Sequence, residues 1–154
     1  MSGAQLDLDG LRTVADYQFG RGVGEALFTG DLHVERSRSG RPRQVTTDDG
    51  RVATYLTDGR LSIGLEGGRR LQAALDPPGY RVVVGEESEP FVRDGKNAFA
   101  KFVRDVDPDV RPGDEVLVVT ETDALLGVGR AELSARAMAD FETGMAVLVR
   151  DGSD

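Results

Sequence analysis

The segment Asp76-Pro77-Pro78-Gly79, near the middle of the chain, most constrains the fold. Two consecutive prolines offer no backbone N–H donors and clash with a preceding helical turn, and the glycine after them favours a turn. Any helix that arrives from the N-terminal side must end here. At 154 residues the chain suits one domain or two small ones. We therefore predict two domains, residues 1–78 and residues 79–154.

The first half predicts a small mixed α/β domain. Apolar residues recur at helical spacing over residues 8–19, and residues 23–28 predict either a short second helix or a tight connection. Segments with alternating or β-branched residues, separated by Ser-Gly and Asp-Asp-Gly turn signals, predict an antiparallel meander. The expected strands are residues 32–36, 43–47, 51–56 and 61–63. A further helix is expected over residues 64–75.

The second half predicts a small barrel. Residues 89–93 predict one helical turn, and we expect Ser134 to cap a short helix that reaches about Phe141. Five strands with short helices in so short a span indicate a closed or nearly closed barrel. The expected strands are residues 81–84, 99–103, 115–120, 125–131 and 145–150. The predicted fold class of the whole chain is therefore α+β.

The charged residues are unusual in kind. The net charge is -8, aspartate outnumbers glutamate, and Lys96 and Lys101 are the only lysines. This composition resembles proteins of halophilic archaea, whose carboxylates keep the surface hydrated in concentrated salt. An acidic balance ordinarily disfavours a nucleic-acid partner because it repels phosphate. At molar salt the Debye length is only about 3 Å, so we expect local contacts by arginine, backbone amides and shape to decide binding.

The sequence offers little for catalysis or for metal binding. There is no cysteine, His33 is the only histidine, and no arrangement of serine, carboxylate and histidine follows a known motif. Asp105, Asp107 and Asp109 alternate as in cation loops but lack the glycine and glutamate of an EF-hand. We expect no catalytic residue, no metal and no cofactor. No segment approaches the roughly 18 apolar residues that span a membrane, and a cytoplasmic location is expected.

The order of signals in the second half resembles the PUA domain found appended to RNA-modifying enzymes. The segments that carry the resemblance are RVVV, GKNAFAKFV, DPDVRPGDEVLVV and LLGVGRAELSARAMADFETGMAVLVR. Its specific part is the pairing of RPGDEV with GVGRA and a following helix, ending in G-x-A-V-x-V-R. The resemblance implies a PUA-type pseudo-barrel that binds RNA.

The first half resembles the segment that precedes the PUA domain in archaeal tRNA-guanine transglycosylase and archaeosine synthase. LRTVADYQFGRGVGEALF, RSRSGRPRQV and LSIGLEGGRRLQAAL carry this resemblance. The base-exchange chemistry of that family belongs to a barrel of roughly 250 residues, which cannot fit here. The resemblance implies a protein that docks tRNA, alone or beside a separate catalytic subunit, with no DNA or membrane partner. The alternative is a protein-interaction module that keeps the PUA fold without binding RNA.

PUA domains bind RNA along a glycine-containing loop after their first helix and against their last strand. By this resemblance, Gly95 would let the backbone approach RNA, Lys96 would neutralise a phosphate, and Asn97 would meet a base edge or a 2′-hydroxyl. For each charged residue, a solvated surface position is the alternative. The RNA-binding candidates here are Gly95, Lys96, Asn97, Ala98, Lys101, Arg104 and Arg150.

A second basic concentration lies within ERSRSGRPRQV, in the expected meander. Alternation would place several guanidinium groups along one side of a hairpin, at a spacing suited to adjacent phosphates. The alternative is that these arginines pair with the nearby carboxylates Glu35, Asp48 and Asp49. The RNA-binding candidates here are Arg36, Arg38, Arg41 and Arg43.

The aromatic residues of the second half fall within apolar runs. We therefore expect them to lie in the core rather than to serve as platforms for stacked bases. They are Phe91, Phe99, Phe102 and Phe141.

Overall fold

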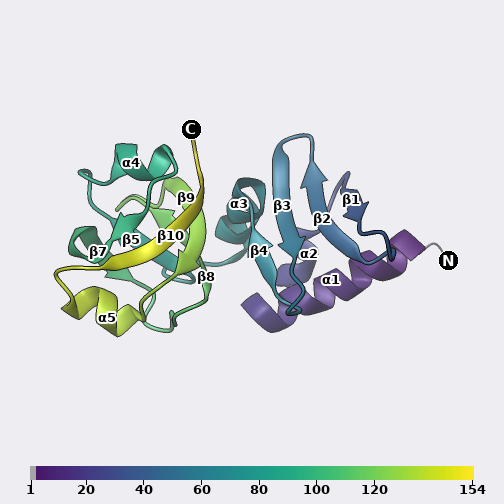
Figure 1. The fold of residues 1–154 in the computed structure, drawn as a ribbon, viewed down its shortest axis with the longest axis horizontal. Coiled ribbons are helices and arrows are strands. Elements are labelled where there is room, and N and C mark those ends of the chain that lie inside the picture. Colours follow the sequence, from purple (N-terminus) through teal and green to yellow (C-terminus); the bar gives the residue numbers. More distant parts are fainter. Residues whose placement is uncertain (1–2) are drawn as a thin grey trace. The chain divides into compact units, whose positions relative to one another are not determined.

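The computed structural model describes residues 3–154, with side chains from Leu8 onward. Two compact units make up the chain, Met1–Ala74 and Leu75–Asp154. Each unit has a sheet of its own, with four strands in the first and six in the second, and Figure 1 shows the two sheets with their helices. The mixed helix and strand content confirms the predicted α+β class.

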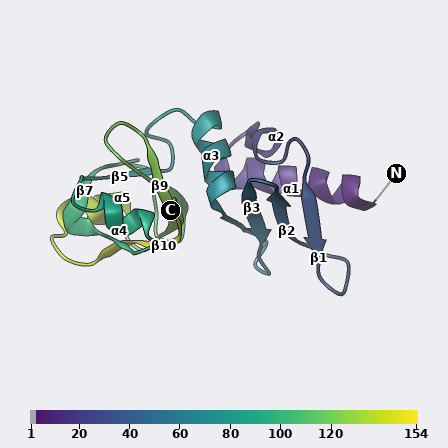
Figure 2. The same cartoon turned by 90° about the horizontal axis from the view of Figure 1, so that it is seen from above.

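The first unit is the predicted antiparallel meander, and residues 61–63 form its fourth strand as expected. Its strands are β1 (His33–Arg36), β2 (Pro42–Thr47), β3 (Gly50–Tyr55) and β4 (Leu61–Ile63), paired in chain order. Its helices are α1 (Gly3–Phe19), α2 (Val23–Leu27) and α3 (Leu65–Ala74), and Figure 2 shows them along one side of the strands. The helical spacing predicted for α1 places Leu11, Ala15 and Phe19 in the core.

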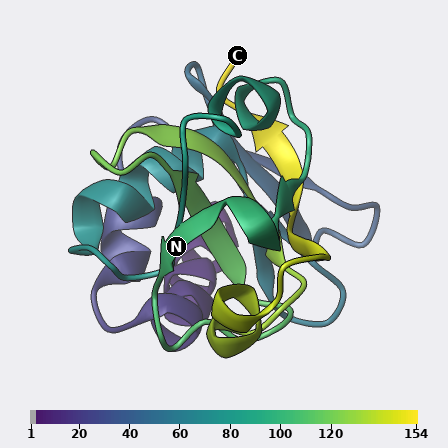
Figure 3. The same cartoon turned by 90° about the vertical axis from the view of Figure 1, so that its left-hand side faces the viewer.

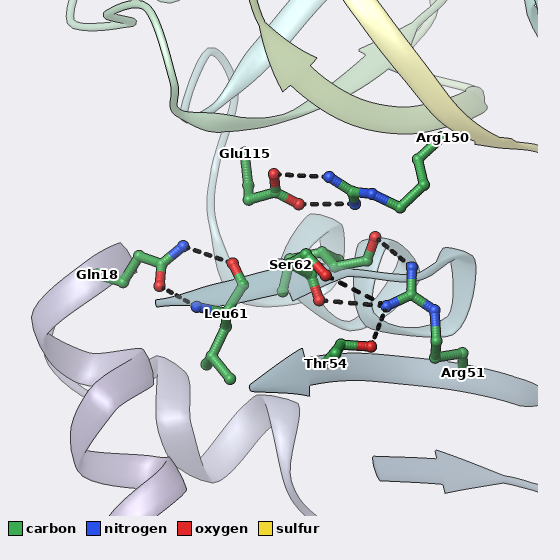
Figure 4. A network of polar contacts seen from close by, with 8 residues as sticks. Gln18, Arg51, Thr54, Leu61, Ser62, Glu115 and Arg150 are labelled. Atoms are coloured by element: carbon green, nitrogen blue, oxygen red, sulfur yellow. Dashed lines mark hydrogen bonds and ion pairs between the residues drawn. The ribbon is translucent and has the colours of Figure 1, made fainter. Parts of the chain in front are cut away.

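Gln18 of α1 completes the free edge of this sheet. Its side-chain nitrogen donates to the Leu61 carbonyl at 2.9 Å, and its oxygen accepts from the Leu61 N–H at 2.8 Å, as Figure 4 shows. Because β4 ends the sheet, these backbone groups have no neighbouring strand, and the amide of Gln18 supplies the same pair of bonds that a strand would.

The second unit is the predicted small barrel. The strands are β5 (Arg81–Val84), β6 (Ala98–Phe99), β7 (Val103–Val106), β8 (Glu115–Val119), β9 (Leu125–Ala131) and β10 (Met145–Gly152). They lie in the order β6-β10-β9-β8-β5-β7, and only β5 and β8 run parallel. Buried valines, leucines and alanines from both ends of this order form one core.

The barrel nearly closes where we had predicted a single strand over residues 99–103, and that prediction was wrong. The chain forms β6, then the 3-10 turn η1 (Ala100–Phe102), then β7. The Ala100 N–H donates to Gly144 just before β10, whereas the Phe102 carbonyl accepts from Gly85 just after β5. One short segment therefore touches both ends of the sheet, and the turn supplies the change of direction. The strands in the barrel number six rather than five.

Two short helices lie at opposite ends of the barrel, as Figures 1 and 3 show: α4 (Glu89–Arg93) and α5 (Ala135–Asp140). The predicted cap of α5 is confirmed, because the Ser134 hydroxyl accepts from the Ala137 N–H at 3.1 Å. Both helices contribute to the core, α4 through Val92 and α5 through Met138.

A buried arginine fixes the start of the barrel. Arg81 is 1% exposed, and its guanidinium donates to the Asp123 carboxylate at 2.9 and 3.2 Å and to the carbonyls of Leu75 and Gly79. A buried guanidinium is tolerated only when its donors are satisfied, and these bonds supply a carboxylate as well as carbonyl partners. The network ties β5 to the turn that follows β8 and to the residues around the Pro-Pro break.

Candidate nucleic-acid interface

A groove follows the seam of the barrel from α4 to the segment that precedes β10. Its volume is about 530 Å³, within the range of roughly 300–1,000 Å³ typical of small-molecule sites. Three phenylalanines, both lysines of the chain and several hydrogen-bonding groups line it. They are Ser88, Phe91, Lys96, Asn97, Phe99, Lys101, Phe102, Glu142, Thr143 and Gly144.

The glycine loop, residues 94–98, packs against the C-terminal strand β10. Gly95 has φ 86°, a left-handed conformation that favours glycine. A Cβ on Gly152 would meet the Arg93 carbonyl oxygen and would lie 2.5 Å from the Gly95 nitrogen, so only glycine lets the two segments approach this closely. The Asn97 side-chain oxygen accepts from the Val149 N–H at 3.0 Å, and Ala98 is buried. The loop is therefore a fixed platform.

Both lysines present their ammonium groups at the groove. Lys96 is 60% exposed in its side chain and lies 3.4 Å from the Asp94 carboxylate. The Lys101 ammonium lies 4.9 Å from the centre of the Phe102 ring, which is cation–π distance. Lys96 remains accessible to a phosphate because an exposed ion pair of this kind contributes little free energy, and Lys101 is itself exposed.

The prediction that all four phenylalanines lie in the core was wrong. Phe91 is 56% exposed, Phe99 46% and Phe141 51%. Phe91 lies on α4 with Val92 turned inward, and Phe99 ends β6 where the chain turns into η1. Both rings line the groove, as does the half-buried Phe102, whereas Phe141 lies outside it. The apolar runs predicted the strands and helices but not which side chains point outward.

Two further predicted candidates, Arg104 and Arg150, are also engaged in ion pairs. The Arg104 guanidinium contacts the Glu87 carboxylate at 2.6 Å. Arg150 makes two parallel bonds of 2.8 Å to Glu115, which is 7% exposed, as Figure 4 shows. Because β9 lies between β8 and β10, the second pair spans three strands. It gives Arg150 a structural role in the barrel.

The arginine hairpin, which we define as Arg36, Arg38, Arg41 and Arg43, surrounds the turn between β1 and β2. Arg41 donates to the carbonyls of Tyr55 and Leu56, and its guanidinium lies 4.1 Å from the centre of the Tyr55 ring. Arg36 donates to the Gly40 carbonyl. Arg38 and Arg43 are exposed, and among the described residues neither forms an ion pair.

A carboxylate near the arginine hairpin contacts a histidine rather than an arginine. Asp48, which we weighed as a partner for the arginines, lies 3.5 Å from His33 instead. The carboxylate of Asp107, in the second unit, accepts hydrogen bonds from the N–H groups of Tyr80 and Asp109, so this part of the acidic run belongs to a turn.

Within residues 3–154, no helix is long and apolar enough to cross a membrane.

Charge is distributed unevenly between the units. Residues 1–74 carry ten acidic side chains and ten arginines, whereas residues 75–154 carry 17 acidic side chains against nine lysines and arginines. The net charge of -8 therefore belongs to the unit with the groove. Within that unit, both lysines line the groove.

Family comparison agrees with this division of the chain. Residues 9–78 match the patch-forming domain C2 of tRNA-guanine transglycosylase, and residues 80–152 match the PUA domain. The chain joins a C2 domain to a PUA domain. The groove accordingly lies within the PUA domain, and the arginine hairpin lies within the C2 domain.

Archaeal relatives share this pair of domains in their C-terminal region. The chain is 50% identical over 148 residues to tRNA-guanine(15) transglycosylase of Methanothermobacter thermautotrophicus, covering 95% of this chain and 23% of that protein. It is 50% identical over 143 residues to the enzyme of Pyrococcus furiosus, covering 92% and 24%. The chain thus spans about a quarter of the length of these relatives.

Solved structures share the fold at low identity. A hypothetical protein of Pyrococcus horikoshii superposes with a TM-score of 0.74 at 22% identity, covering 99% of this chain and 92% of that one. A conserved PUA domain protein of Thermoplasma acidophilum gives 0.65 at 20% identity, covering 99% and 91%. These likenesses confirm the predicted PUA-type fold.

Residues of the groove that the sequence prediction missed come from three separate segments. They are Ser88, Phe91, Phe99, Phe102, Glu142, Thr143 and Gly144. The one available signal was the position of Phe99 beside Lys101, but an apolar residue in a strand is more often buried. Only closure of the barrel brings residues 142–144 to the same groove.

Proposed function

We propose that the chain binds structured RNA, in particular tRNA, and docks it for a modifying enzyme without catalysing the modification itself. The observation that carries the proposal is the groove at the barrel seam, where exposed phenylalanine rings and the two lysines converge. The names of the archaeal relatives supply tRNA as the particular RNA. The residues that belong to the groove would hold the RNA by contact, without covalent chemistry.

The groove favours an unpaired nucleotide over a helical segment. An exposed aromatic ring offers a surface on which any base can stack, and stacking of this kind contributes about 1–3 kcal/mol per base. Lys96 and Lys101 supply positive charge for the phosphates on either side of that base. The left-handed Gly95 leaves room for the RNA backbone, because nothing in the chain lies within 4 Å of the position that a Cβ would take. The phenylalanine rings would thus contact the base, and the lysines would contact the phosphates.

The acidic surface of the PUA domain sets the conditions under which binding occurs. Long-range attraction to RNA is unfavourable for a unit with 17 acidic and nine basic side chains. In concentrated salt the Debye length shrinks to about 3 Å, so repulsion from distant carboxylates fades while stacking persists. We propose that the protein is adapted to a salt-rich cytoplasm, in which a contact groove remains effective where a broad basic face would fail.

The arginine hairpin of the C2 domain provides a second contact. The Arg41 guanidinium stacks on the Tyr55 ring and donates to the carbonyls of Tyr55 and Leu56. Arg38 and Arg43 are exposed. Exposed guanidinium groups without carboxylate partners are suited to bidentate phosphate contacts. We propose that one stretch of the RNA backbone meets the hairpin while an unpaired nucleotide occupies the groove. The domain boundary between them is proposed after Pro78.

A separate catalytic subunit, or a catalytic region outside these residues, would perform the modification. The matched region is about a quarter of the relatives. Among the described residues, neither the Ser88 nor the Thr143 hydroxyl of the groove is hydrogen-bonded to a carboxylate or a histidine that could act as its base. The role proposed for the chain is to orient the RNA. It requires no cofactor.

The test measures binding of the purified chain to its host's tRNA and to duplex DNA over a salt series that reaches molar concentration. We expect tRNA binding that persists at high salt, and little DNA binding. The double variant Lys96→Ala/Lys101→Ala should weaken tRNA binding and lower the salt slope by about one per lysine. The matched control is Arg111→Ala/Arg136→Ala, which removes the same charge from exposed positions outside the groove.

Failure to bind tRNA at any salt concentration would contradict the proposal and favour a protein-interaction module. Equal weakening by the lysine pair and by the arginine pair would show that overall charge, rather than the groove, governs binding.

A further inference from the structure

A carboxylate lies in the groove in which we propose that RNA binds. Glu142 lines it together with Lys96 and Lys101. A negative charge repels phosphate, so its presence in a site for a polyanion calls for a physical explanation. The explanation depends on which part of the nucleotide it meets.

The position of Glu142 is fixed by the barrel seam. The segment between α5 and β10 is tied down at Gly144, whose carbonyl accepts from the Ala100 N–H at 2.9 Å. This bond brings residues 142–144 beside η1, which carries Lys101 and Phe102. Glu142 therefore lines the same groove as Phe91 of α4.

The Glu142 carboxylate is not paired with the neighbouring lysines. Lys96 pairs with Asp94, and Lys101 lies over the Phe102 ring. Among the described residues, Glu142 forms no ion pair and no hydrogen bond. Its acceptor oxygens are thus available to a ligand, and neither ammonium group is paired with them.

We infer that Glu142 reads the edge of the stacked base and selects a base that carries an exocyclic amine. Carboxylates accept hydrogen bonds from the N4 amine of cytosine, and they meet a repelling carbonyl at the same position of uracil. Cytosine and uracil have the same ring size and differ at that position, so Glu142 separates them by hydrogen bonding rather than by stacking. This inference rests on the proposed function of the groove.

The experiment compares binding of short fluorescent oligo(rC) and oligo(rU) to the full chain at neutral pH and fixed salt. We expect the wild-type protein to prefer oligo(rC) by about fivefold or more, the lower end of the discrimination given by a specific base contact. Glu142→Gln should bring the ratio of the two affinities close to one, because an amide can donate to uracil as well as accept from cytosine.

The matched control is Glu121→Gln, which removes the same charge from an exposed position outside the groove and should leave the ratio unchanged. Equal wild-type affinity for both oligonucleotides would overturn the inference while leaving RNA docking intact. A Glu142→Gln variant that binds both more tightly at an unchanged ratio would also overturn it, because Glu142 would then only repel phosphate. If neither oligonucleotide nor tRNA binds the wild-type protein, the proposed function itself fails.

Discussion

Replacing Phe91 by alanine tests whether the exposed rings of the groove hold a base. The ring is 56% exposed and lies on α4, whose neighbouring Val92 supplies the core contact. Truncating a fully buried phenylalanine costs about 3–5 kcal/mol, but less than half of this residue is buried and alanine is a good helix former. We expect Phe91→Ala to lower the free energy of unfolding by about 1–2 kcal/mol at most.

We expect a clear loss of RNA affinity, although the variant loses little stability. Stacking on one aromatic ring contributes about 1–3 kcal/mol, and each 1.4 kcal/mol is about tenfold in affinity. Since Phe99 and Phe102 remain in the groove, we expect the lower part of that range, about a 5- to 30-fold weaker complex. The protein should stay folded at the temperature of the assay, so the loss of affinity reports on the missing ring.

Fluorescence anisotropy with labelled tRNA measures the affinity, and thermal melting by circular dichroism checks the fold. Phe141→Ala is the matched control, because Phe141 is exposed to a similar extent, 51%, but does not line the groove. It should leave the affinity unchanged. Unaltered binding by Phe91→Ala, or an equal loss in both variants, would refute stacking in the groove.

Two further predictions concern the support of the groove. Arg150→Ala leaves the buried Glu115 carboxylate without its bidentate partner, and we expect about 1–3 kcal/mol of lost stability in urea denaturation, discounted because Arg150 is partly exposed. Weaker tRNA binding without lost stability would instead place Arg150 at the RNA. Gly152→Ala forces a Cβ against the backbone of Arg93 and Gly95, so hydrogen exchange in the glycine loop should accelerate and tRNA affinity should fall. Unchanged exchange would contradict the view that the C-terminal strand holds this loop.

Local signals in the sequence were sufficient for most of the helices and strands. The helix α3 ends at Ala74, just before the Pro-Pro-Gly break, because proline and glycine act on the backbone wherever they occur. Ser134 caps α5 as predicted, because a cap depends only on residues within one turn. The alternation in the meander likewise gave β1, β2 and β3, since side-chain direction in a strand follows from its period of two.

Only part of the candidate site could be predicted, because local signals identify residues that are close in sequence but not those that are distant. The glycine loop with Lys96, Asn97 and Lys101 is one short stretch of sequence, and these residues do line the groove. The arginine hairpin is also local, but the sequence could not show that Arg41 stacks on Tyr55 or that Arg150 pairs with Glu115. Such partners are separated by 14 and 35 residues, and distant pairs depend on the completed sheets.

The sequence by itself determined the PUA-type fold and the position of both lysines in the glycine loop and just after it. Only the tertiary structure decided that residues 99–103 bend through η1, that the rings of Phe91 and Phe99 face outward, and that Glu142 joins them. The physical reason is closure of the barrel. A strand pattern specifies which residues alternate, but the seam forms where the two ends of the sheet meet, and that meeting point depends on every strand between them.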